Sequence, residues 1–224
     1  MLKIRQTLNA NPQPLVLVNG EGGIGKTSIA AKYWHTYEKD YKHLAWLFCE
    51  SGIVNAMCNS LVYSLKIEDR FKQVPEQSQL EFLKNELAGL ERECLLILDN
   101  ANDKPHIEEF LQVFNGLGWH VLITSRCQKV VKNEIYINHL PQPLAKQLFE
   151  KYYQETTSTF ENFLNRFLRA VGYNTLCIEI FAKNLREMAA LGETMESFLT
   201  KLERKGLYLG NDSFEIQTDY TQNK

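Results

Sequence analysis

The segment GEGGIGKT at residues 20–27 constrains this chain more than any other feature. It matches the pattern G-x-x-x-x-G-K-[ST], whose glycines let the backbone curl so that successive N–H groups face phosphate oxygens. The segment follows the apolar run PLVLVN at residues 14–19 and precedes an amphipathic stretch from Lys26 to Tyr37. A strand, a glycine-rich loop and a helix in this order predict an α/β fold with a nucleotide site.

The loop supplies most of the candidate binding residues. We expect Lys26 to reach the β- and γ-phosphates, the Thr27 hydroxyl to ligate Mg²⁺, and the Ser28 amide to reach the α-phosphate. The loop residues expected to contact the nucleotide are Gly20, Gly22, Gly23, Ile24, Gly25, Lys26, Thr27 and Ser28. The alternative is a glycine-rich turn without a ligand, and the position of the motif between a strand and a helix argues against it.

Four further apolar runs are typical of strands. They lie at residues 43–50, 94–100, 120–126 and 134–140, and helical patterns occupy 52–66, 77–90 and 106–114. Strands that are apolar on both faces and alternate with helices predict a parallel sheet covered on both sides. Ligands of such sheets bind at the carboxyl ends of the strands.

Asp99 ends the most apolar of these runs. An aspartate in this position can hold Mg²⁺ through water, although strand-ending aspartates are also common turn residues. The next residue is Asn100, which cannot act as a general base. Because such a base contributes about 10²- to 10⁴-fold in rate, we expect slow hydrolysis unless another carboxylate such as Asp103 substitutes.

Arg126 follows the run at residues 120–125 directly. An arginine at this point can reach a γ-phosphate and register its presence. The alternative is an ordinary surface arginine on a loop. Lys26, Asp99, Asn100 and Arg126 are therefore the candidate catalytic residues, and Thr27 and Asp99 the candidate metal ligands.

The pattern becomes helical after Leu140. Helices are expected at 142–154, 158–171, 175–190 and 194–203, the second with six apolar residues on one face. We therefore divide the chain into an α/β domain at 1–140, a helical subdomain at 141–206 and a polar tail at 207–224, which would begin a further domain.

Composition excludes several classes of function. The formal net charge is −2 and no long block of one sign occurs, so nothing indicates nucleic-acid binding. Five scattered cysteines without a CxxC pair favour free thiols in the cytoplasm over disulfides or zinc. No apolar run approaches the roughly 18 residues of a membrane span.

The segments GGIGKT, LLILDN, HVLITSR and GYNTLCIEI, in this order and spacing, resemble the nucleotide-binding core of the STAND signal-transduction ATPases, and among them the NB-ARC-like group. The resemblance covers roughly residues 10–205. It implies the strand order 43–49, 94–98, 120–125, 14–19, 134–138, that is 2-3-4-1-5 for five parallel strands. It also implies that Arg126 is the arginine that senses the γ-phosphate.

The resemblance further implies an adenine contact from the helical subdomain. Family members carry a G-x-P-L segment there, and this chain has Thr175 in place of the proline, followed by Leu176. Asn174 can cap a helix that starts at Thr175, so we expect Thr175 and Leu176 to keep the adenine contact. Relatives continue into a winged-helix domain and sensor repeats, and we expect this chain to be the core of such a longer protein.

The preferred hypothesis is a molecular switch that binds ATP or ADP with Mg²⁺, hydrolyses ATP weakly, and engages protein partners or self-associates in its full-length parent. One alternative is an AAA+-like motor or loader, which needs a catalytic acid near Asp99 and an arginine from a neighbouring subunit. A second is an interaction scaffold that needs no nucleotide, against which Lys26, Thr27 and Asp99 argue. A small-molecule kinase would need an arginine-rich lid after Leu140, and the sequence has none.

Overall fold

The computed structural model describes residues 1–10, 14–90, 93–114, 116–154, 157–190, 196 and 199–200. It separates into two compact units, Met1–Ile137 and Asn138–Lys224, which are described one at a time.

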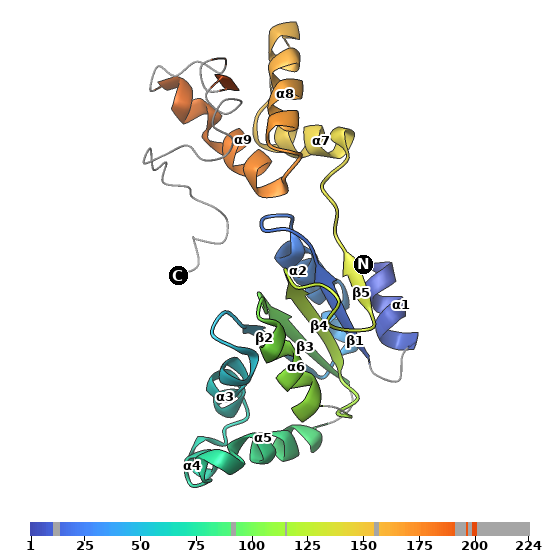
Figure 1. Ribbon diagram of the computed structural model, residues 1–224, viewed down its shortest axis with the longest axis vertical. Helices are drawn as coiled ribbons and strands as arrows, with labels where there is room; N and C mark the ends of the chain where they lie inside the picture. The colour runs from blue at the N-terminus through green and yellow to red at the C-terminus, as the bar shows by residue number, and fades with distance from the viewer. Residues whose placement is uncertain are drawn as a thin grey trace. The chain divides into compact units, whose positions relative to one another are not determined.

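The first unit is built on a five-stranded parallel sheet (Figure 1). Its strands are β1 (Leu15–Asn19), β2 (His43–Phe48), β3 (Cys94–Asp99), β4 (His120–Ser125) and β5 (Glu134–Tyr136). The spatial order β2-β3-β4-β1-β5 confirms the order 2-3-4-1-5. Since β4 lies between β1 and β3, the carboxyl ends of these three strands adjoin.

Helices cover both faces of this sheet because successive side chains of a strand point to opposite sides. On one face, Leu95 and Ile97 of β3 share a core with α1 (Leu2–Ala10) and α2 (Lys26–Tyr37). On the other, the alternate residues of β3 pack with α3 (Ile53–Ser64), α5 (Gln79–Ala88) and α6 (Lys104–Val113). Short segments α4 (Glu68–Lys72), η1 (Glu38–Asp40) and η2 (Glu76–Ser78) complete the unit. All of β3 is buried, which explains why its residues before Asp99 are apolar without a break.

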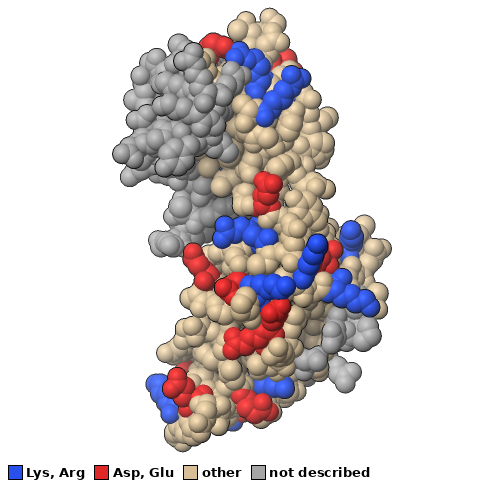
Figure 2. All heavy atoms as spheres, in the orientation of Figure 1, with Lys and Arg blue, Asp and Glu red and all other residues tan. Residues whose placement is uncertain are grey.

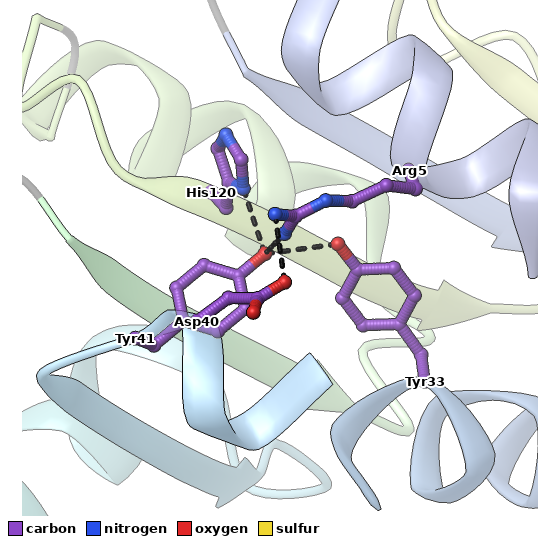
Figure 3. Close-up of polar contacts among 5 residues, drawn as sticks. All are labelled: Arg5, Tyr33, Asp40, Tyr41 and His120. Carbon is purple, nitrogen blue, oxygen red and sulfur yellow. Dashed lines mark hydrogen bonds and ion pairs between the residues drawn. The ribbon is translucent and has the colours of Figure 1, made fainter. Parts of the chain in front are cut away.

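A polar cluster ties α1 to the sheet (Figure 3). Arg5 of α1 donates to the Tyr41 hydroxyl at 2.8 Å and to Asp40 at 3.0 Å. The Tyr41 hydroxyl also lies 2.9 Å from that of Tyr33 and 2.7 Å from Nδ1 of His120, at the start of β4. Burial raises the pKa of Tyr41. Burial, followed by the positive charge of Arg5, lowers the pKa of His120.

The second unit is helical, with α7 (Gln142–Tyr152), α8 (Ser158–Ala170) and α9 (Thr175–Ala190). These helices confirm the patterns at 142–154, 158–171 and 175–190. Their core is aromatic: the ring of Phe149 is fully buried, and its centroid lies 5.9 Å from that of Phe167. Phe167 in turn stacks on Phe181 at 4.2 Å. The Thr157 hydroxyl caps α8 by accepting from the Phe160 amide.

Three differences from the sequence-based expectations concern element limits. The helix α1 was not predicted, the fifth strand is only three residues long, and α4 interrupts the region between two predicted helices. Most of the helix predicted at 194–203, and all of the tail at 207–224, lie outside the described residues.

Two further features concern the helices and the distribution of charge on the surface. None of the described helices is both long and apolar enough to cross a lipid bilayer. On the face drawn in Figure 2, the coloured basic and acidic side chains are interspersed rather than gathered by sign.

Candidate nucleotide-binding site

The glycine loop continues directly from β1 into α2, and its shape depends on particular glycines. At Gly20 a Cβ atom would lie 2.9 Å from the main-chain oxygen of Ile137, so no side chain fits there without movement. Gly25 has φ +101°, a conformation that strains other residues, and it immediately precedes α2. Ile24 between them is buried.

Lys26 is held inside this loop. Its Nζ donates to the main-chain oxygens of Gly20 at 3.0 Å and Glu21 at 2.7 Å. Burial lowers the pKa of Lys26, and the charge of Arg126 lowers it further, while Asp99 opposes both. The lysine, the arginine and the aspartate therefore interact electrostatically around one place, although they come from three separate segments.

Thr27 and Asp99, the two predicted metal ligands, are in direct contact. The Thr27 hydroxyl donates to Oδ1 of Asp99 at 3.0 Å. The Thr124 hydroxyl donates to the same oxygen and itself accepts from the main-chain N–H of Asn100 at 3.0 Å. Asp99 is only 3% exposed, so these hydroxyls replace much of the water that its carboxylate would otherwise bind.

Buried polar side chains mark this end of the sheet. Those of the described residues are Asn19, Asp99, Thr124 and Ser125. All four lie at the carboxyl ends of β1, β3 and β4. Burying polar groups costs free energy unless they are hydrogen-bonded, so such groups gather where a site requires them.

Asn100 and Arg126 are joined through a residue that the sequence analysis did not single out. Asn102 donates through Nδ2 to the side-chain oxygen of Asn100, and its Oδ1 accepts from the main-chain N–H of Arg126 at 2.8 Å. Asn100 has φ +61°, a conformation that asparagine adopts more readily than most residues. The sequence offered one signal for Asn102, namely the two asparagines in the run DNAND. The hydrogen bonds of Asn102 also involve Arg126, directly after β4, and local sequence does not predict that contact.

A second polar group fixes the segment that follows Arg126. The Glu134 carboxylate accepts from the main-chain N–H groups of Lys129, Val130 and Val131 and from the Asn19 amide at 2.9 Å. Burial opposes the charge on Glu134, but these donors outweigh it and hold its pKa below the usual range. Asn19 directly precedes the glycine loop, so the loop and the segment after Arg126 share an anchor.

The other candidates occupy different places. Asp103 caps α6, with Oδ1 accepting from the His106 amide at 3.1 Å. Thr175 and Leu176 begin α9 in the second unit, where Asn174 accepts from the Leu176 amide at 3.1 Å as an N-cap does.

A cavity of about 620 Å³ lies at the amino-terminal ends of β1 and β4, beside Pro14 and Trp119, at the opposite end of the strands from the glycine loop.

The chemistry of the Thr27–Asp99 pair suits Mg²⁺. A hydroxyl and a carboxylate oxygen are hard ligands, and Mg²⁺ commonly takes only one or two protein oxygens and completes its shell with phosphate and water. Within the described ranges no three His, Cys, Asp or Glu side chains gather as a metal site. Thr27 and Asp99 offer two protein oxygens, which suits a metal that takes its other ligands from a polyphosphate and water.

A glycine loop with an embedded lysine, a Thr–Asp pair at its edge and a five-stranded sheet in the order 2-3-4-1-5 together define the P-loop nucleotide-binding fold. A model of the NB-ARC domain matches residues 1–161. The chain belongs to the NB-ARC family.

Solved structures share this fold at low sequence identity. Domain III of the replication initiation protein DnaA from Thermotoga maritima has a TM-score of 0.55 and 17% identity, with 90% of each chain covered. AMPPCP-bound DnaA from Aquifex aeolicus has a TM-score of 0.52 and 18% identity, over 90% of this chain and 63% of that one.

A STAND protein with a tetratricopeptide repeat sensor from Pyrococcus horikoshii has a TM-score of 0.55 and 16% identity. The match covers 81% of this chain and 29% of the Pyrococcus protein, so this chain corresponds to less than a third of it. No curated protein matches the sequence.

Proposed function

We propose that this chain is the nucleotide-dependent switch module of a larger STAND-type regulator, which binds ADP or ATP with Mg²⁺ and hydrolyses ATP slowly. The observation that carries the proposal is the 3.0 Å contact between the Thr27 hydroxyl and the Asp99 carboxylate at the edge of the glycine loop. It brings a loop hydroxyl and a strand-end carboxylate together, and this supports the proposal that the two hold one Mg²⁺ ion.

Each residue has a distinct part in this proposal. The loop amides and Lys26 bind the β- and γ-phosphates. Thr27 and Asp99 hold Mg²⁺, which when bound offsets phosphate charge. Arg126, whose charge lowers the pKa of Lys26, is proposed to distinguish a triphosphate from a diphosphate. The amides of Gly22, Gly23, Ile24, Gly25 and Ser28 complete the phosphate contacts.

Slow hydrolysis is supported by the groups around Asp99. The side-chain oxygen of Asn100 accepts from Asn102, and an amide cannot take a proton from water. Asp103, considered from the sequence as a substitute, is engaged as the cap of α6. This arrangement favours a switch that holds its nucleotide over an AAA+-like motor, for which the solved DnaA structures supply only a shared fold.

The switch itself requires that ATP and ADP stabilise two arrangements of the full-length protein differently. Arg126 supplies that difference in this proposal because it interacts with the γ-phosphate alone. Thr175 and Leu176 are proposed to contact adenine, and the parent protein to engage protein partners or self-associate in its ATP form.

Lys26→Ala tests the proposal. We expect the variant to keep its fold and to lose at least about tenfold in affinity for Mg-ADP, because the phosphates lose the ammonium group that lies within the loop. Isothermal titration calorimetry measures the affinity. In the parent, Mg-ADP at about one hundred times its dissociation constant should add ~2.7 kcal/mol to the free energy of unfolding.

The matched control is Lys32→Ala, which removes an exposed lysine from the same helix. It should bind Mg-ADP as the parent does, and circular dichroism should show the same secondary structure for all three proteins. Equal affinity of the parent and Lys26→Ala would refute the assignment of the loop.

A further inference from the structure

The chains that leave β3 and β4 stay side by side beyond the sheet. The last registered pair of these strands is Leu98 with Ile123. After it, side chains and main chain continue the contact residue by residue. The Ala101 N–H donates to the Thr124 oxygen at 3.0 Å, the Ser125 hydroxyl donates to the Ala101 oxygen, the Arg126 N–H donates to Oδ1 of Asn102 at 2.8 Å, and the Cys127 thiol donates to the Asn102 oxygen at 3.2 Å.

Asn102 is the residue through which this extension reaches Arg126. Both ends of its side-chain amide are used: Oδ1 accepts from the main chain of Arg126 and Nδ2 donates to Asn100. The opposite orientation of the amide would set its NH₂ group against the N–H of Arg126, so these partners determine which way it faces. Removing the side chain would therefore leave Arg126 and Asn100 without their common partner.

The segment that begins with Arg126 has one anchor at each end. Glu134 and its main-chain donors hold the far end. Asn102 holds the near end through its hydrogen bond to the main-chain N–H of Arg126. The side chain of this arginine is proposed to meet the γ-phosphate. Asn102 also directly precedes Asp103, the N-cap of α6, so one hydrogen bond and one peptide link connect Arg126 to that helix.

We propose that Asn102 is a positioning residue, which sets the discrimination between ATP and ADP by fixing the main chain of Arg126 and linking it to Asn100 and the start of α6. The inference rests on the proposed function of the site. It assigns to Asn102 no contact with the nucleotide itself, and Asn102 acts on affinity only through Arg126.

The experiment is a double-mutant cycle on the 224-residue chain. Affinities for Mg-ADP and for Mg-AMPPCP, a non-hydrolysable ATP analogue, are measured by calorimetry for the parent, Asn102→Ala, Arg126→Ala and the double variant. The quantity compared is the ratio of affinity for AMPPCP to affinity for ADP. Asn59→Ala, which removes an exposed asparagine of α3, is the control.

Arg126→Ala should lower this ratio by about fivefold or more, the usual lower range of coupling between sites. Asn102→Ala should lower it by a similar factor while leaving ADP affinity within about threefold of the parent. In the double variant the two effects should not multiply, because one residue acts through the other. Asn59→Ala should leave the ratio unchanged.

Four outcomes would overturn the inference and leave the nucleotide site in place. Asn102→Ala could leave the affinity ratio unchanged, or it could weaken the binding of ADP and AMPPCP equally. The effects of the two substitutions could multiply in the double variant, or Arg126→Ala could leave the ratio unchanged. A parent that binds neither nucleotide would instead remove the proposed function, and the inference with it. Thermal unfolding of each variant without nucleotide separates a loss of fold from a change in discrimination.

Discussion

Asn100 occupies the position directly after Asp99, on a strand end where two hydroxyls already satisfy one carboxylate oxygen. Its backbone has φ +61°, and its side-chain oxygen accepts from Asn102. An aspartate at this position could keep the accepted hydrogen bond, since a carboxylate oxygen accepts as an amide oxygen does. It would add the proton acceptor that the amide lacks.

We therefore expect Asn100→Asp to raise the rate of ATP hydrolysis by about tenfold or more, within the range that a general base contributes. Single-turnover assays with excess protein measure the step without product release. Asp103→Asn is the control, because asparagine caps a helix as well as aspartate and the rate should not change. If Asn100→Asp hydrolyses ATP no faster than the parent, another group positions the water.

At this scale the sequence predicts the residues of the motifs but not their partners. Lys26, Thr27 and Asp99 follow from spacing and from the strand that each one ends or follows. Asn102 and Glu134 do not, because their hydrogen bonds join segments whose neighbourhood is decided by the order of the strands.

Some helices and strands can be predicted from the sequence, and others cannot. The apolar runs of β1, β3 and β4 predict buried parallel strands because both of their faces are covered. Helix α1 has a weaker pattern, with only Ile4 and Leu8 buried. Its position depends also on Arg5, which meets Tyr41 and Asp40 from other elements (Figure 3). A helix with two apolar contacts and one long-range polar contact is difficult to recognise from local sequence.

The same cluster predicts a pH dependence of stability. Folding lowers the pKa of His120, so the unfolded chain binds more protons at acidic pH. Stability should therefore fall as the pH drops below about 6.5, the ordinary value for histidine, and continue to fall until the folded form is protonated. Protonated Nδ1 would also donate toward a Tyr41 hydroxyl that already accepts from Arg5.

Urea denaturation at pH 5.5 and pH 7.5 measures this effect for the parent and for His120→Gln, which does not titrate in this interval. The parent should lose more stability than the variant between the two pH values. Equal losses would show that other groups account for the acid sensitivity of the fold.

For the whole molecule, the change from alternating runs to a helical pattern predicts an α/β unit followed by helices. The contacts divide the chain after Ile137. The two units have separate apolar cores, and the second is dominated by phenylalanines such as Phe149 and Phe167. The proposed response to nucleotide cannot be predicted from periodicity, because periodicity carries no information about a ligand or a partner.

Leu176→Ala tests whether the second unit contributes to binding, as the proposed adenine contact requires. We expect about fivefold weaker binding of Mg-ADP, equivalent to ~1 kcal/mol, and unchanged binding of Mg-pyrophosphate, which has no base. Leu144→Ala removes a similarly exposed leucine from α7 and should change neither. Equal loss of both ligands, or of neither, would contradict the adenine contact.

The two hydrogen bonds that Lys26 makes within its own loop have a thermodynamic consequence. They use two of the three N–H donors of the ammonium group and order it before any polyphosphate binds. Much of the entropy needed to order the loop is therefore lost during folding rather than during association. A phosphate contact that replaces one of these two bonds then contributes only the difference between the bond given up and the bond formed.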